Sequence, residues 1–315
     1  MADSVLVVDV GGTNARFAVC RPGARPEKVI TYHCGDHASL EAAMRTALAA
    51  LNATPRRAAV AAAGPVDDGR VRMTNHPWQF SADELAAAIG FEQCVVLNDF
   101  AAIAHSLPYL ASGDVQPIGG GVAESRTPMV VLGPGTGLGV AALLPTGNGW
   151  QAVASEAGHT AFAPHDTDEA ALLTEIWRGQ DMVEVEQLLS GPGLLTLHAA
   201  TTALAGKKIV ATDPVAITAE AATDPASAAA RTVAAFARIL GGFAGDMALS
   251  FTARGGVFIG GGIVPHLGDL FDAQGFRQRF EAKGRFHDYV AAVPTSIITE
   301  PNPALIGLSA LLAQS

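Results

Sequence analysis

Two glycine-rich stretches of the same design are the first candidates for chemistry in this chain. "VVDVGGTNARF" spans residues 7–17 and "VVLGPGTGLGV" spans residues 130–140. Aligning Thr13 with Thr136 also aligns the valine pairs, so each copy predicts a strand, a glycine-rich tip and a second strand. Glycine allows close approach of the backbone, and converging N–H groups suit phosphate oxygens. We predict two hairpins that hold one polyphosphate; ordinary hairpins with a chance similarity are the alternative.

Neither tip carries one of the two common nucleotide-binding fingerprints. The chain has no G-x-x-x-x-G-K-[ST] sequence, so a P-loop is not supported. The second tip has glycines at positions 135, 137 and 139, which does not match G-x-G-x-x-G. A Rossmann dehydrogenase is therefore disfavoured.

Asp9 interrupts the first apolar strand near its end, where a charge needs a partner. Its carboxylate either accepts hydrogen bonds from backbone N–H groups of the turn or lies near a magnesium ion on the phosphates, often through water. The adjacent tip favours the magnesium interpretation.

Asn98 and Asp99 follow the apolar run of a predicted strand and precede a helical stretch. Polar residues at the carboxyl ends of strands are where α/β proteins place their sites. Asp99 either caps the helix that begins near Phe100 or accepts a proton from a substrate hydroxyl, as the positioned carboxylate of a kinase does.

Further acids and a histidine stand between the second tip and the next glycine-rich turn. Glu156 and His159 lie three residues apart, and Glu186 precedes "SGPG". An isolated acid such as Glu186 is usually a solvated helix residue. Together with Asn98 and Asp99, however, these groups both donate and accept hydrogen bonds, as the hydroxyls of a neutral polyol require.

The segment "HCGDH" at residues 33–37 resembles a metal-ligand cluster. It lacks a second pair of ligands at zinc spacing, so an exposed loop before the next helix is the preferred interpretation.

Alternating β-branched runs and alanine-rich stretches predict an α/β protein. Strands are expected over residues 5–10, 16–19, 56–64, 71–75, 94–98, 129–133 and 140–144, and within 254–263. Helices are expected over residues 39–51 and 81–90, near 167–177, 181–189 and 192–204, within 226–252 and over 302–313. Because residues 108–128 are rich in Pro, Gly and Ser, we predict a small lobe of residues 1–108 plus 300–315 and a large lobe of residues 109–299.

The composition restricts the class of protein. Of 315 residues, 49% are hydrophobic and 16% are charged, which favours a sizeable core and disfavours long disordered tails. A formal charge of −10 argues against non-specific binding to nucleic acid or anionic membranes. No signal peptide or membrane span is expected, and three scattered cysteines favour a reducing compartment. We expect a cytoplasmic protein with no nucleic-acid or membrane partner.

Taken in order, several motifs resemble bacterial ATP-dependent glucokinases. They are "DVGGTNARFAV", "TNHPWQFS", "LNDFAAIAH", "LGPGTGLGV", "SEAGH", "LSGPGL" and "IGGGIVP". The resemblance implies the two-lobed actin-like ATPase (ribonuclease H-like) fold of the actin, sugar-kinase and Hsp70 superfamily, with a cleft between lobes. It also implies phosphoryl transfer from ATP to the 6-hydroxyl of glucose, with Mg²⁺, in a homodimer. A kinase for another hexose and a non-catalytic sugar-binding sensor are the alternatives.

The resemblance also implies roles for individual residues. Asp99 would be the general base; an unperturbed aspartate, with a pKa of about 3.9, is a weak base, so its main contribution would be orientation. Asn98, Asp99, Glu156, His159 and Glu186 would hold glucose. The nucleotide would be bound by Asp9, Gly11, Gly12, Thr13, Asn14, Gly133, Gly135, Thr136, Gly137, Gly260, Gly261 and Gly262, with Asp9 near the metal.

Two departures from the family pattern concern small residues. Ala157 replaces the first glycine of "E-G-G-H", and Val8 stands where relatives often have glycine. The cysteine-rich zinc motif of the related repressor and kinase group is absent from the sequence, which favours the non-zinc branch. We expect the site to tolerate Ala157.

Overall fold

The computed structural model describes residues 4–73, 76–178, 180–207 and 211–314. The chain divides into two compact units, which are described separately. The first contains residues 1–111, 143–154 and 300–315, and the second contains residues 112–142 and 155–299. This division by contacts places residues 143–154 in the first unit, whereas the lobes expected from the sequence place them in the second. The functional lobe boundaries stay a prediction.

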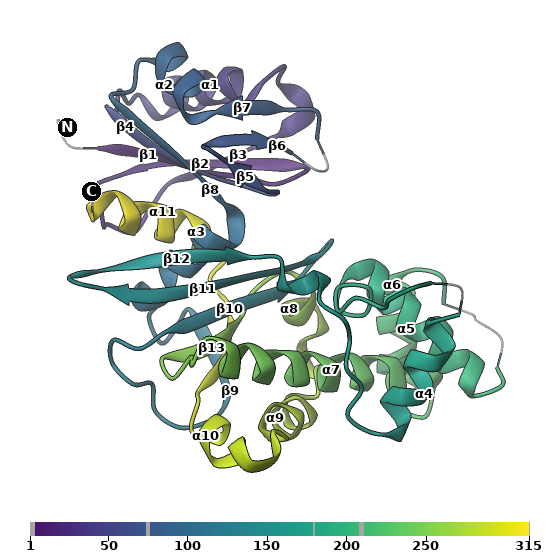
Figure 1. Cartoon of the computed structure of the whole chain (residues 1–315). Coiled ribbons are helices and arrows are strands. Elements are labelled where there is room, and N and C mark those ends of the chain that lie inside the picture. Colours follow the sequence, from purple (N-terminus) through teal and green to yellow (C-terminus); the bar gives the residue numbers. More distant parts are fainter. Residues whose placement is uncertain (1–3, 74–75, 179, 208–210, 315) are drawn as a thin grey trace. The chain divides into compact units, whose positions relative to one another are not determined.

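The first unit is built on a five-stranded sheet in the order β3-β2-β1-β4-β8 (Figure 1). Strands β1 and β2 form an antiparallel hairpin, and β1, β4 and β8 run parallel. The bounds are β1 Val5–Val10, β2 Asn14–Cys20, β3 Val29–His33, β4 Arg57–Ala62 and β8 Gln93–Asn98. A small sheet joins β5 Val66–Asp67, β6 Arg70–Arg72 and β7 Gln79–Ser81. Of the strand predicted over 71–75, residues 74–75 lie outside the described part of the chain.

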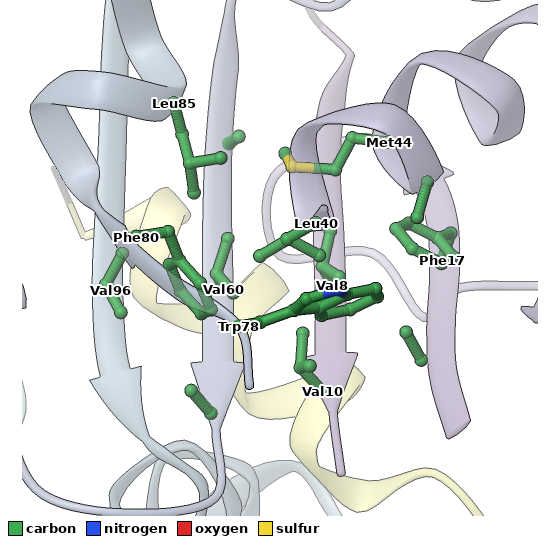
Figure 2. Close-up of a cluster of buried hydrophobic side chains, with 14 of the residues drawn as sticks. Val8, Val10, Phe17, Leu40, Met44, Val60, Trp78, Phe80, Leu85 and Val96 are labelled. Atoms are coloured by element: carbon green, nitrogen blue, oxygen red, sulfur yellow. The ribbon is translucent and has the colours of Figure 1, made fainter. Parts of the chain in front are cut away.

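Helices cover both faces of this sheet, and the two-residue period of β1 assigns its side chains to them. Leu6, Val8 and Val10 pack with helices α1 and α2. Figure 2 shows Val8 and Val10 in this cluster together with Trp78 and Phe80. The opposite face packs against α3 and α11, which lie side by side. The bounds are α1 Leu40–Leu51, α2 Ala82–Ile89, α3 Asp99–Ser106 and α11 Pro303–Ala313, with the short 3₁₀ turns Cys34–Asp36 and Leu107–Tyr109.

The alternation along β1 determines where Asp9 points. Val5 and Val7 face α3 and α11, so Asp9, two residues further on, faces the same side. Because α3 begins at Asp99, the strand period brings the two acids to one face of the sheet.

A second sheet repeats this strand order. It runs β12-β11-β10-β13-β14, with β9 added at the far edge, and residues 143–154 of its hairpin strands are the ones grouped with the first unit. As in the first sheet, a hairpin (β10 and β11) is followed by parallel strands (β10, β13 and β14). The bounds are β9 Val115–Gly119, β10 Met129–Pro134, β11 Leu138–Thr146, β12 Gly149–Ser155, β13 Gly256–Ile259 and β14 Thr295–Ile298. The two similar tips thus belong to two sheets with the same order of strands.

The helices of the second unit include the long helix α7, on which α5, α6, α9 and α10 pack. They are α4 Thr167–Ile176, α5 Gly191–Leu204, α6 Pro214–Thr223, α7 Ala228–Ser250, α8 Ile263–Leu267, α9 Ala273–Glu281 and α10 His287–Ala291, with 3₁₀ turns at Ala157–His159, Gly268–Leu270 and Gly284–Phe286. By length and hydropathy α7 could span a membrane, but 78% of its most apolar window is buried in the protein. That burial is typical of a core helix.

Three local expectations differ from the structure. Residues 181–189 form turns and one β-bridge instead of a helix, because Glu184 pairs with Ala161. The buried strand expected within 254–263 is limited to β13, since Gly261, with a φ of +74°, leaves the extended conformation. The Pro/Gly/Ser-rich stretch 108–128 contains β9, which pairs with β14 and was missed because Pro117 and Gly119 mask its strand pattern.

Candidate active site

Asp99 is fixed at the first position of α3, directly after β8. The helix cap is Asn98, not Asp99: its Oδ1 accepts hydrogen bonds from Phe100 N at 3.0 Å and Ala101 N at 3.2 Å. Asn98 Nδ2 also donates to the carbonyl oxygen of Gly64. Asp99 Oδ1 accepts one hydrogen bond, from Phe100 N at 2.9 Å. Asn98 is therefore the N-cap of the helix, while the Asp99 carboxyl also accepts from the first helix N–H.

The environment makes Asp99 a better base than an exposed aspartate. Burial raises the pKa of its carboxyl from 3.8 to about 6, the hydrogen bond from Phe100 N opposes this, and the charge of Asp9 adds to it. This pKa is higher than that of the unperturbed aspartate considered above. A base with a pKa closer to neutral pH accepts a proton with more driving force.

Asp9 is paired with Arg16, which was missed in the sequence. Arg16 Nη1 lies 3.1 Å from Asp9 Oδ2, and the two residues are direct partners across the β1–β2 hairpin. Burial raises the pKa of Asp9, while Arg16 acts in the opposite direction. The signal was available, since Asp9 and Arg16 are nearly equidistant from the tip of a predicted hairpin and cross-strand partners interact.

The segment at residues 33–37 packs against the first tip and holds its backbone in place. Cys34 N donates to the carbonyl oxygen of Thr13 at 2.8 Å, and Cys34 Sγ lies 3.5 Å from the carbonyl oxygen of Gly11. Gly11 N donates to Asn14 O, which closes the turn and leaves Gly12 and Thr13 at the end of the hairpin. The buried Cys34 is thus a support of the tip, which explains the position of the apparent ligand cluster.

The second tip packs on the triple glycine without side chains between the two backbones. A Cβ atom added at Gly133 would lie 2.6 Å from the Gly260 carbonyl carbon, and one added at Gly261 would lie 2.5 Å from Pro134 O. Gly260 N donates to Leu132 O at 2.8 Å, and Gly261 has a φ of +74°. These glycines are therefore required for the close approach of Gly260–Gly262 to the tip that contains Gly135, Thr136 and Gly137.

Glu186 is attached to the same tip. Its Oε2 accepts a hydrogen bond from Leu138 N at 2.7 Å and would lie 2.6 Å from a Cβ atom added at Gly137. Glu186 N donates to the carbonyl oxygen of Gly158. Glu186 is thus not a solvated helix residue, because its backbone and side chain join two segments of the predicted site.

His159 lies among three acids, one of which was missed. Its Nδ1 is 2.9 Å from Glu184 Oε2, and its Nε2 is 3.9 Å from Glu156 Oε2. The hydrogen bond to Glu184 raises the pKa of His159, with further contributions from the charges of Glu186, Glu184 and Glu156. Glu184 comes close because residues 160–162 pair with residues 183–185. The sequence does not show this pairing, since a helix was expected there.

The substitution at Ala157 falls where the backbone tolerates a side chain. The neighbouring Gly158 is buried, and a Cβ atom added there would lie 2.6 Å from the carbonyl oxygen of Leu138. The second glycine of the motif is therefore the one that packing requires.

The predicted residues thus form one group in each unit. The first group contains Asp9, the tip Gly11–Asn14, Asn98 and Asp99. The second contains the tip at 133–137, Gly260–Gly262, Glu156, His159 and Glu186, with Glu184 added.

Comparisons with known proteins agree over almost the full length. The family model described as Glucokinase matches residues 6–315. The chain belongs to the glucokinase family. It is 45% identical to the glucokinase of Aromatoleum aromaticum, over 98% of this chain and 94% of that protein. It is 41% identical to the glucokinase of Paramagnetospirillum magneticum, over 99% and 98% of the two chains. The expected family is confirmed.

Solved structures give the same fold. A glucokinase from an Antarctic psychrotroph matches with a TM-score of 0.93 and 37% identity, over 100% of both chains. A glucokinase from Balamuthia mandrillaris matches with a TM-score of 0.80 at 21% identity, over 99% of this chain and 94% of that one. The expected two-lobed actin-like sugar-kinase fold is confirmed.

Proposed function

We propose that this protein transfers the γ-phosphoryl group of ATP to the 6-hydroxyl of glucose and releases glucose 6-phosphate and ADP. Membership of the glucokinase family over residues 6–315 is the observation that carries this proposal. The buried, high-pKa carboxyl of Asp99 at a helix start supports it independently, because alcohol phosphorylation uses a positioned carboxylate.

Asp99 acts as the general base. At pH 7.5 a carboxyl with a pKa of about 6 is mostly ionised, so it accepts the hydrogen bond of the 6-hydroxyl and then its proton. The sugar oxygen forms a bond to the γ-phosphorus as the bond to the β,γ-bridging oxygen breaks, and ADP carries away the released electron pair. Asn98 holds the start of α3, so it positions Asp99 as well as offering its remaining amide N–H to the sugar.

The glycine tips bind the nucleotide. Gly11, Gly12, Thr13 and Asn14 form one phosphate clasp and Gly133, Gly135, Thr136 and Gly137 form the other, with Gly260–Gly262 next to the adenosine. Thr13 and Thr136 are exposed at the two ends, where their hydroxyls donate to phosphate oxygens. The close backbone packing of Gly133 on Gly260 keeps the second clasp and the adenosine loop in one rigid piece.

Asp9 is the residue that fits a magnesium ion on the phosphates. Its carboxylate is a hard oxygen donor, which Mg²⁺ prefers, and its pKa is raised by burial, as expected of a carboxyl that a cation would stabilise. When bound, the ion supplies charge neutralisation at the transferring phosphoryl group. Arg16, at 3.1 Å, holds the Asp9 carboxylate in place.

Glu156, His159 and Glu186 complete the glucose site with Asn98 and Asp99. Each sugar hydroxyl both donates and accepts, and a set of carboxylates with one protonatable imidazole offers both functions. Glu184 accepts from His159 Nδ1 and so directs its Nε2 to the ligand side. Glu186 couples sugar and nucleotide, because its carboxylate is bonded to the second tip.

A homodimer, a cytoplasmic location and the absence of nucleic-acid and membrane partners remain proposals. The charge of −10 supports the last of them. Light scattering of the purified protein tests the dimer, and a mass of one chain would contradict it.

The decisive experiment is a coupled assay of ADP release across sugars and phosphoryl donors. We expect ADP release from ATP that depends on glucose and on Mg²⁺. A tenfold higher kcat/KM for another hexose would overturn the choice of substrate. Glucose binding in calorimetry without glucose-dependent ADP release would instead favour a sugar-binding sensor.

A further inference from the structure

A cavity of about 470 Å³ lies within the second unit, among three helices. Its volume is in the range of small-molecule sites, about 300–1,000 Å³. Helix α4 contributes Asp168, α5 contributes Thr201 and Leu204, and α7 contributes Arg231 and Arg238, with alanines between them. No lining residue belongs to the groups assigned to glucose or ATP, so the proposed function does not account for this cavity.

The two arginines share one face of α7. They are seven residues apart, or about two turns, so both side chains can approach one ligand. Arg231 Nη1 donates to the carbonyl oxygen of Ala226. For Arg238, no hydrogen bond or ion pair is recorded among the residues that the structure describes, and its buried Nε lacks a partner there. Asp168 lines the same cavity. Among the described residues, it forms no ion pair with either arginine.

A second observation points to the same place. In the described ranges, five buried side-chain nitrogen or oxygen atoms lack a hydrogen-bond partner. Four of them lie on α5 and α7, namely His198 Nε2, Thr201 Oγ1, Thr202 Oγ1 and Arg238 Nε. Thr201 and Arg238 line the cavity. Buried polar groups are normally paired, and a half-buried guanidinium without an ion-pair partner is costly. The Thr201 hydroxyl and the Arg238 guanidinium can therefore both donate to an acceptor on a bound ligand.

We propose that this cavity binds a small organic anion: a carboxylate or phosphate ester on a compact apolar body. The Arg238 guanidinium receives the anionic group, since its planar fork matches carboxylate and phosphate oxygens. Thr201 Oγ1 donates one further hydrogen bond, and Arg231 adds positive charge at the rim. The apolar body packs on Leu204 and the alanines of α4 and α7. A neutral ligand would leave the Arg238 charge uncompensated.

Calorimetry with the full-length chain tests the site, in a buffer without phosphate or carboxylate. Benzoate and phenyl phosphate are the anionic probes, and benzamide is the neutral probe of the same shape as benzoate. We expect both anions to bind with one site per chain, and benzamide to bind at least tenfold more weakly. Arg238→Gln should weaken benzoate binding at least tenfold, and Thr201→Val, which preserves side-chain shape, should weaken it severalfold. Arg72→Gln, the same substitution at an exposed arginine of β6, should leave binding unchanged.

Three results would overturn the proposal. One is that neither benzoate nor phenyl phosphate binds at concentrations up to 10 mM. Another is equal binding of benzoate and benzamide. A third combines two observations: the parent chain binds no anion, and folded Arg238→Gln has a different oligomeric state. That result would assign the cavity to a contact with a second copy of the chain. If Arg238→Gln fails to fold, Thr201→Val and the benzoate–benzamide difference still decide the question.

Discussion

Asp99→Asn should make the protein more stable at neutral pH while removing most of its activity. The folded state raises the pKa of this carboxyl from 3.8 to about 6. Between these two pH values the folded chain binds more protons than the unfolded chain, so stability falls as pH rises through this window. Above pH 6 the ionised carboxyl costs about 3 kcal/mol, from 1.36 kcal/mol for each pKa unit. Asparagine is isosteric and retains an oxygen for Phe100 N, so it removes this cost.

The gain should therefore depend on pH. We expect Asp99→Asn to raise the free energy of unfolding by up to about 3 kcal/mol at pH 7.5, with little change at pH 4. For a chain of this length that corresponds to a Tm increase of about 5 °C. Thermal unfolding is measured without substrates or Mg²⁺, because a bound cation would stabilise the ionised form. Asp269→Asn, at an exposed position with no recorded partner in the described chain, is the matched control and should show no pH-dependent gain.

The catalytic part of the same prediction is separate. Loss of a general base typically lowers kcat by about 10²–10⁴, and Asp99→Asn should do so while glucose still binds in calorimetry. A variant with near-parental kcat would refute the assignment of the base. A Tm gain of equal size at pH 4 and pH 7.5, or a loss at pH 7.5, would refute the raised pKa even if activity disappears.

Three further changes test the remaining parts of the structure. Gly261→Ala should raise the KM for ATP at least tenfold, because the added Cβ meets Pro134 O. Gly268 also has a positive φ but no neighbour within 4 Å, so Gly268→Ala is the control. A similar increase in KM for the control would contradict the packing argument. Glu184→Gln should lower the pKa of His159 in an NMR titration, since the hydrogen bond to Glu184 is the main cause of its increase, and an unchanged pKa would contradict that pairing. Gly307→Ala should destabilise the first unit by about 1–3 kcal/mol or more in denaturant unfolding, because its Cβ would lie 1.8 Å from Ala102 O where α11 crosses α3.

Local features of the fold were predictable because local chemistry determines them. Ser81 caps α2 and Gly90 ends it in the left-handed region, as the capping signals predict. The two hairpins were predictable from a repeated pattern of valines and glycines. The helix expected at 181–189 was wrong, because backbone pairing with residues 160–162 outweighs local propensity.

The candidate site was predictable in its individual acids but not in their partners. Glu184 approaches His159 only through a pairing of two distant segments, so no spacing in the sequence indicates it. The pKa of Asp99 likewise depends on burial and on Asp9, which the strand period places on the face of α3. Arg16 is the exception, since hairpin register alone sets it opposite Asp9.

The repeated scaffold explains why the two units have unequal roles. Both sheets place a glycine-tipped hairpin beside parallel strands, and in each copy a helix begins after the last parallel strand at an asparagine, Asn98 or Asn302. The first copy has Asp9 before its tip and Asp99 at its helix start, whereas the second has Leu132 and Pro303 at these places. The scaffold therefore provides a glycine-tipped hairpin twice, but a carboxylate pair once. Two such pairs would add repelling charge near a polyphosphate, so a single carboxylate pair agrees with the nucleotide and magnesium roles proposed for these residues.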